Sequence, residues 1–151
     1  MNTIAKFSNF QKAYNLHDSL AKAGKYVTIT DTAAGIEDRL IVESREFQVG
    51  DGATVCGYSD RDAYTVVKLT SKTLTIREDK STLLNGMNSG EKDALVCHPG
   101  GFCGHVEGTQ RYSYEANPKG HTVVARLTKK GWKVKGSRVI AGRSHYHDYN
   151  F

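Results

Sequence analysis

The chain has 151 residues, of which 38% are apolar and 25% are charged, and its formal net charge is +5. This length suits one domain with a buried core, and no apolar run approaches the roughly 18 residues that span a membrane. The N-terminus lacks the basic stretch and the uninterrupted apolar run of a secretory signal. Three cysteines, an odd number, argue against a disulfide framework and favour a reducing compartment. We therefore expect a cytoplasmic protein without a membrane partner.

Positive charge is concentrated in the last third of the chain. Residues 101–151 carry nine Lys or Arg against three Asp or Glu, whereas residues 1–100 carry 12 against 13. Such an excess is typical of a surface that binds nucleic acid or a phosphate-bearing ligand. The alternative is that these cations only keep a sheet surface solvated.

Residues 1–25 are predicted to form an N-terminal helix. Apolar and aromatic residues recur there at helical spacings of three and four, at Phe7, Phe10, Tyr14, His17 and Leu20. Ser8 and Gln11 match a capping box, and Gly24 supplies a C-terminal stop. We expect the apolar stripe to dock on the protein's own sheet or on a partner subunit.

Residues 26–151 are predicted to form a single β-rich domain. Runs of β-branched and aromatic residues, separated by turn residues, lie at 26–30, 39–43, 53–58, 63–69, 73–78, 111–115, 122–127, 132–135 and 138–142. This pattern indicates a mainly β fold, either an antiparallel SH3-like small barrel or a twisted sheet, with the one N-terminal helix.

The middle of the chain carries the turn signals of such a barrel. Residues 47–79 resemble the opening of SH3-like barrels, in which a V-G-D turn leads into a three-stranded meander. We expect positive φ at Gly50 and Gly52, and a hairpin tip at residues 71–72. Residues 79–90 contain the turn dipeptides NG and SG and are predicted to form an exposed loop.

The stretch CHPGGFCGHVEG, at residues 97–108, has ligand types that suit zinc. Its candidate ligands are Cys97, His98, Cys103 and His105. The stretch lacks the paired C-x2-C spacing of a structural zinc site, so we predict no metal there, although metal binding stays open. The alternative is a glycine-rich crossover loop in which Phe102 offers a ring for stacking on a ligand.

No catalytic pattern is present in the sequence. Cys97 and His98 are neighbours, and neighbours along a strand point to opposite faces. Phosphate-binding loops, dinucleotide-binding loops and H-E-x-x-H motifs are absent from the sequence. We therefore predict a protein that is not an enzyme and carries no cofactor.

Arginines alternate with aromatic residues late in the chain. Arginine presents a planar donor fork that matches phosphate, and aromatic faces stack on bases. The predicted nucleotide-binding residues are Arg111, Tyr112, Arg138, Arg143 and Tyr146, together with Phe102. The alternative is that the rings pack in the barrel core while the arginines face solvent.

The end of the chain, residues 144–151, is crowded with imidazole and aromatic rings. As a strand it would place His145, His147, Tyr149 and Phe151 on one face. We expect this last strand to close the core and to hold Arg143 at its start.

The motifs VGDGATV (49–55), YSDRDAYTV (58–66), RYSYEANPKG (111–120) and GRSHYHDYNF (142–151) resemble a family of small phage and prophage proteins. That family is similar to the Thoeris anti-defence proteins, which act as sponges for cyclic nucleotide signals. The resemblance covers residues 47–151 and implies a non-enzymatic homo-oligomer in the bacterial host cytosol. It implies that a small nucleotide is sequestered at subunit interfaces by arginines and a stacking ring.

Two other functions are compatible with the sequence. One is an SH3-like module that binds RNA or DNA, with Lys and Arg on one face as a phosphate track. The other is an inhibitor of a host defence protein, of the anti-CRISPR type, that would use exposed loops such as YSDRDAY.

Overall fold

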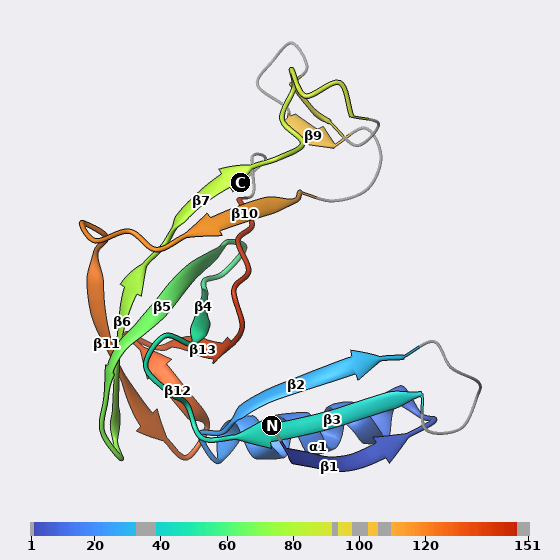
Figure 1. Ribbon diagram of the computed structural model, residues 1–151, viewed down its shortest axis with the longest axis vertical. Coiled ribbons are helices and arrows are strands. Elements are labelled where there is room, and N and C mark those ends of the chain that lie inside the picture. The colour runs from blue at the N-terminus through green and yellow to red at the C-terminus, as the bar shows by residue number, and fades with distance from the viewer. Residues whose placement is uncertain (1, 33–38, 92–93, 98–102, 106–109, 148–151) are drawn as a thin grey trace.

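A computed structural model describes residues 2–32, 39–91, 94–97, 103–105 and 110–147. They form a mainly β protein with one helix, as the sequence predicts. The molecule has three parts, namely a barrel, an N-terminal sheet covered by the helix, and a two-stranded arm (Figure 1).

Six strands close into a small antiparallel barrel in the order β11-β12-β13-β4-β5-β6. They are β4 (Gly52–Cys56), β5 (Arg61–Leu69), β6 (Thr73–Glu78), β11 (Thr122–Thr128), β12 (Gly131–Val134) and β13 (Ser137–Ala141). Alternate residues point inward and form the core, with Leu74, Ile76 and Val66 almost fully buried. The small-barrel prediction is therefore confirmed.

The N-terminal sheet has the order β1-β3-β2, from β1 (Asn2–Phe7), β2 (Tyr26–Asp31) and β3 (Leu40–Arg45). Helix α1 (Phe10–Lys22) packs on this sheet, and Ala13, Val27, Leu40 and Val42 form a second buried core there. Of the two alternatives, the helix docks on the protein's own sheet, although not through the predicted stripe. The sheet under α1 combines β1, which precedes the helix, with β2 and β3, which follow the predicted boundary at residue 25.

The predicted start of the helix was wrong. Residues 2–7 are a strand, since they pair with β3, and the N-cap is Asn9, whose side chain accepts a hydrogen bond from the Lys12 N–H. The predicted stripe also differs from the observed one. Ala13, Leu16 and Leu20 face the sheet, whereas Phe10 and Tyr14 are 50% and 56% exposed.

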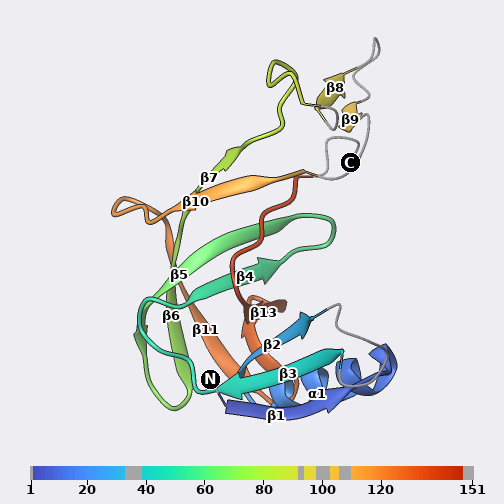
Figure 2. The ribbon, with the colours of Figure 1, turned by 45° about the vertical axis from the view of Figure 1, so that its right-hand side comes forward.

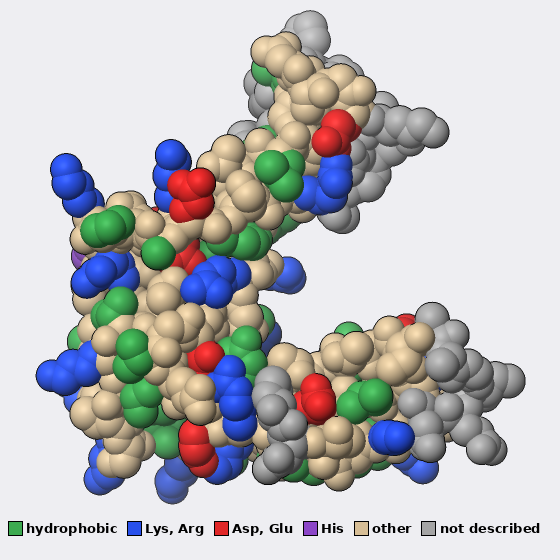
Figure 3. All heavy atoms as spheres, in the orientation of Figure 1, with side chains coloured by type: hydrophobic (Ala, Val, Ile, Leu, Met, Phe, Trp, Pro, Cys, Tyr) green, Lys and Arg blue, Asp and Glu red, His purple; other side chains and the backbone are tan. Residues whose placement is uncertain are grey.

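The arm is a two-stranded ribbon of β7 (Lys80–Leu83) and β10 (Tyr112–Glu115). Beyond it, β8 (Leu95–Cys97) pairs with β9 (Cys103–His105). Figures 1 and 2 show the arm projecting from the barrel, and Figure 3 shows a broad notch between the arm and the N-terminal sheet. The prediction of a loop over 79–90 was wrong for residues 80–83, because the distant β10 makes them a strand.

The terminal segment does not form the predicted strand over residues 144–147. It is extended, but only Tyr146 makes a bridge, with Arg61. The segment instead packs along the arm, and near the outer end of the β7–β10 ribbon the His145 ring meets the Tyr112 ring edge-on with centroids 4.6 Å apart. The His145 N–H also donates to the Tyr114 hydroxyl at 3.0 Å. Residues 148–151 of the predicted strand lie outside the described residues.

The two glycines of the V-G-D-G turn are needed for different physical reasons. Gly50 has φ +95°, as predicted. Gly52 is not among the residues with positive φ. A Cβ on Gly52 would lie 2.7 Å from the Arg143 Cγ, so this glycine makes room for the Arg143 side chain.

Candidate functional site: a cleft between the helix and the barrel

A cleft opens where two barrel strands separate. The β12–β13 ladder has only two residue pairs, Lys133 with Arg138 and Val134 with Ser137. On either side of these pairs the two strands pair with other neighbours: Trp132 pairs with Leu127 of β11, and Val139 pairs with Val55 of β4. Helix α1 lies across this opening and leaves a cavity of about 400 Å³, which we call the seam cleft.

The floor of the seam cleft is apolar. It contains Trp132, Val139, Ile140 and Ala21. The Trp132 ring is only 6% exposed, and its Nε1–H donates to the Gly24 carbonyl at 3.0 Å. This bond satisfies the buried indole N–H and fixes the ring. The floor is therefore a rigid surface.

The rim of the seam cleft is polar and carries cations from both sides. Helix α1 contributes Gln11, Tyr14, Asn15, His17, Asp18 and Lys22, and the barrel contributes Lys130 and Arg138. Lys22 is neutralised by Asp18, four residues earlier on the helix, at 2.7 Å. Neither Lys130 nor Arg138 has a carboxylate within ion-pair distance among the described residues. The two barrel cations therefore give the cleft its positive charge.

The titratable groups of the rim respond to this charge. Burial is the main reason why the pKa of His17 is lowered, and the positive charge of Arg138 lowers it further against the opposing effect of Asp18. His17 is therefore neutral at neutral pH. The pKa of Asp18 is lowered chiefly by its hydrogen bond from Lys22, and the charge of Arg138 contributes.

An exposed ring stands at one edge of the seam cleft. Tyr14 lines the cleft and stacks on Phe10, one turn earlier on α1, with centroids 6.3 Å apart and an interplanar angle of 23°. Exposed aromatic faces of this kind are platforms for flat ring systems. The helical spacing predicts both rings in the buried stripe, so neither was expected as a site residue.

The arrangement can hold a small ligand that has both a ring and an anionic group. An apolar floor, a flat ring and two unpaired cations can hold a molecule that combines a ring with an anionic group. Among the described residues that line the cleft, the Tyr14 phenol is the one hydroxyl, and there is no thiol.

The predicted nucleotide-binding residues that the structure describes do not share one site. Arg138 lines the seam cleft, but Arg143 binds elsewhere, with its Nε–H donating to the Asp79 Oδ2 at 2.8 Å and Nη2 donating to the Thr65 hydroxyl at 2.9 Å. Asp79 is buried, with 1% of its side chain exposed, so Arg143 neutralises a buried charge.

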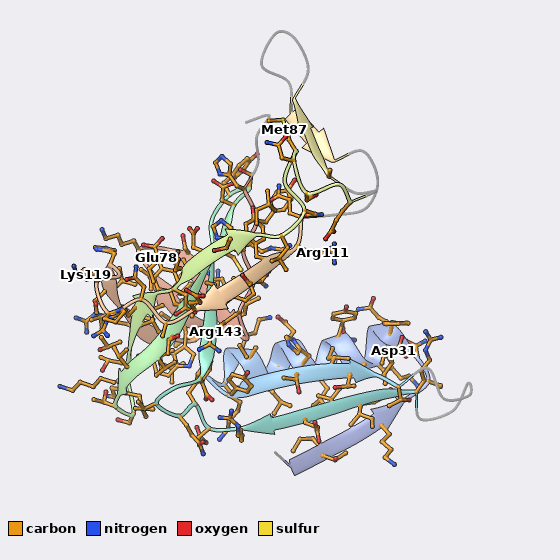
Figure 4. All side chains as sticks on the ribbon, turned by 45° about the horizontal axis from the view of Figure 1, so that its top comes forward. Asp31, Glu78, Met87, Arg111, Lys119 and Arg143 are labelled. Carbon is orange, nitrogen blue, oxygen red and sulfur yellow. The ribbon has the colours of Figure 1, made fainter. Side chains whose placement is uncertain are left out.

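The remaining predicted residues lie on the arm or beside it. Arg111 pairs with Glu91, and Figure 4 shows it on the arm, well away from Arg143. Tyr112 donates its hydroxyl to the Gln110 Oε1 and packs on His145. Tyr146 bridges to Arg61. Phe102 lies outside the described residues. Of the predicted set, Arg138 is thus the member that lies in the seam cleft.

The cysteine and histidine stretch is described only in part. The β8–β9 register places Cys97 opposite Cys103, while His98 lies outside the described residues. Within the described part of the chain, no three His, Cys, Asp or Glu residues are grouped so that they could hold a metal ion.

Comparisons with known proteins found no match for this chain. No protein-family model matches the chain, and no curated protein or solved structure shows significant similarity to it. Among the described residues, no helix combines the length and apolar character that crossing a membrane requires.

Proposed function

We propose that the protein is a non-enzymatic, phage-type anti-defence protein that binds and sequesters a small phosphate-bearing nucleotide, and that the ligand occupies the seam cleft. The observation that carries the proposal is the pairing of two cations that lack ion-pair partners among the described residues, Lys130 and Arg138, with the exposed ring of Tyr14 around one apolar floor. The anti-defence role is what the family resemblance implies.

The size and chemistry of the cleft support a small ligand. Its volume of about 400 Å³ lies in the range of roughly 300–1,000 Å³ that is usual for small-molecule sites. Arg138 and Lys130 can donate charge-assisted hydrogen bonds to phosphate, and Tyr14 can stack on a base. The buried Trp132 and Val139 exclude water from the floor, which strengthens these contacts.

The test is calorimetric titration with cyclic ADP-ribose isomers and with cyclic di- and trinucleotides, followed by heat denaturation and analysis of the released ligand. We expect binding of at least one compound and its recovery intact. Arg138→Gln and Lys130→Gln are each expected to weaken binding about tenfold or more, since each removes a hydrogen bond to a charged group worth roughly 1.5–3 kcal/mol.

Lys129→Gln is the matched control, because Lys129 is exposed beside Lys130 and does not line the cleft. We expect this variant to bind like the wild type. Equal losses in the Lys129 and Lys130 variants would show that only bulk charge matters. Recovery of a hydrolysed or linear product would replace the sequestering role with an enzymatic one.

A further inference from the structure

A row of cations crosses three adjacent strands on the outside of the barrel. Arg126 on β11 lies opposite Lys133 on β12, and Lys133 lies opposite Arg138 on β13. Directly opposed residues of antiparallel strands point to the same face of the sheet. The neighbouring residues Ala125 and Trp132 are buried, so the row faces outward. We call Arg126, Lys133 and Arg138 the cation row.

The row forms no ion pair with the described part of the protein, since Asp18, which interacts with Arg138 at longer range, is paired with Lys22. Thr73 and Cys56, the next residues in register at its two ends, are uncharged. No member of the row has a carboxylate within 4.0 Å among the described residues. The strands and turns from Thr122 to Ala141 contain six Lys or Arg and no Asp or Glu.

Four of the six arginines outside the row have a carboxylate partner, and no ion pair is seen for Arg61 or Arg77 among the described residues. Arg39, Arg45, Arg111 and Arg143 each form an ion pair, with Asp31, Asp51, Glu91 and Asp79 respectively. Like charges that face each other directly across a strand pair destabilise a sheet. The row therefore carries a folding penalty that the chain avoids at those four positions, and solvation of the sheet would not require it.

The turn beside the row adds another cation under strain. Lys135 and Gly136, the two central residues of the β12–β13 hairpin, have φ of +46° and +85°. Positive φ at both positions favours Asn, Asp or Gly at the first, and a lysine there is strained. A basic residue thus occupies a position where a neutral or acidic residue would fit the backbone better.

We propose that the cation row is a docking surface for the phosphate backbone of a nucleic acid. Neighbouring strands lie about 4.8 Å apart, so three residues in register span about 10 Å. One nucleic-acid strand carries about three phosphates over that axial length, at one per roughly 3.4 Å. The row lies on the outward face of the sheet, which suits a polymer that lies across it.

This surface and the seam cleft can be separated by mutation. Arg138 belongs to both, but Arg126 and Lys133 do not line the cleft, and Tyr14 and Lys130 do not belong to the row. The inference therefore does not depend on the proposed nucleotide site.

The test measures fluorescence anisotropy of labelled single-stranded DNA, single-stranded RNA and duplex DNA, each about 20 nucleotides long, between 50 and 200 mM salt. We expect the wild type to bind at least one of them. With about three phosphates contacted on a single strand, its affinity should fall roughly 20-fold over this range. Arg126→Gln/Lys133→Gln should weaken binding and lower the slope of log affinity against log salt by about 1.4 to 1.8.

The control is Lys6→Gln/Lys12→Gln, which removes the same charge from exposed positions on β1 and α1. We expect this control to keep the wild-type slope. Absence of binding at 50 mM salt, or an equal loss of slope in both double variants, would overturn the proposal. Tyr14→Ala should abolish nucleotide binding in the cleft yet leave the salt slope unchanged, so the two proposals can fail separately.

Discussion

At the scale of single residues, Arg143 illustrates how a side chain that resembles a ligand-binding group serves the fold. Its guanidinium bonds to the buried Asp79, which also accepts a hydrogen bond from the Thr65 hydroxyl at 2.5 Å. Gly52 provides the space for its stem. Arg143 therefore fastens the terminal segment to the barrel where the arm begins.

We predict that Arg143→Gln lowers the free energy of unfolding by about 2–4 kcal/mol, because Asp79 would stay buried without its partner. Urea denaturation measures this loss. Arg111→Gln, which breaks the exposed pair with Glu91, should cost at most about 1 kcal/mol. The double variant Arg143→Gln/Asp79→Asn should recover part of the loss. If the Arg143 and Arg111 variants lose equal stability, the structural role of Arg143 is wrong.

At the scale of elements, the barrel strands were predictable and their partners outside the barrel were not. Strand β6 alternates half-buried and buried residues from Thr73 to Arg77, a period of two that the sequence TLTIR displays by itself. In contrast, β1 and β7 become strands because β3 and β10 pair with them from 29 or more residues away. Such non-local pairing overrides local propensity.

The seam cleft was beyond sequence reasoning for a related reason. Phe10 and Tyr14 fit a buried stripe as well as Ala13, Leu16 and Leu20 do, and the choice between the faces depends on how α1 sits on its sheet and beside the barrel. The sequence singles out Arg138 as a candidate binding residue by its charge and its aromatic neighbours. Lys130 and Trp132 line the cleft because α1 lies opposite them, which the sequence does not reveal.

The contact between α1 and its sheet should depend on pH through His17. Its pKa is lowered mainly by burial, so the folded protein favours the neutral imidazole more than the unfolded chain does. This contribution to stability is complete above the ordinary histidine pKa of about 6.5, and it is lost as the pH falls through the lowered value. The stability difference between the wild type and His17→Asn should therefore narrow from about pH 7.5 to about pH 5.

Urea denaturation at each pH measures that difference. His121→Asn is the matched control, because His121 is exposed and lies outside the seam cleft. A difference for His17 that stays constant or widens in acid would mean that the folded protein does not disfavour the imidazolium.

At the scale of the whole molecule, the arm is the part least supported by the rest of the chain. It is a ribbon of two four-residue strands, and isolated ribbons of this kind are marginal in water. The terminal segment supports one face through Tyr112, Tyr114 and His145. Leu84 and Met87 on the arm nevertheless remain 47% and 58% exposed, and Figure 4 shows Met87 toward the tip.

We predict that these exposed residues of the arm are covered by another copy of the chain, which agrees with the homo-oligomer that the family resemblance implies. Native mass spectrometry should show a dimer or a larger assembly for the wild type. Leu84→Asp should shift it toward the monomer, because burying an unpaired carboxylate at an interface is costly. Val49→Asp, at a 65% exposed position in the turn before β4, is the control and should leave the assembly intact. A wild type that is monomeric at all concentrations would refute the prediction, and a shift caused equally by both variants would remove the arm from the interface.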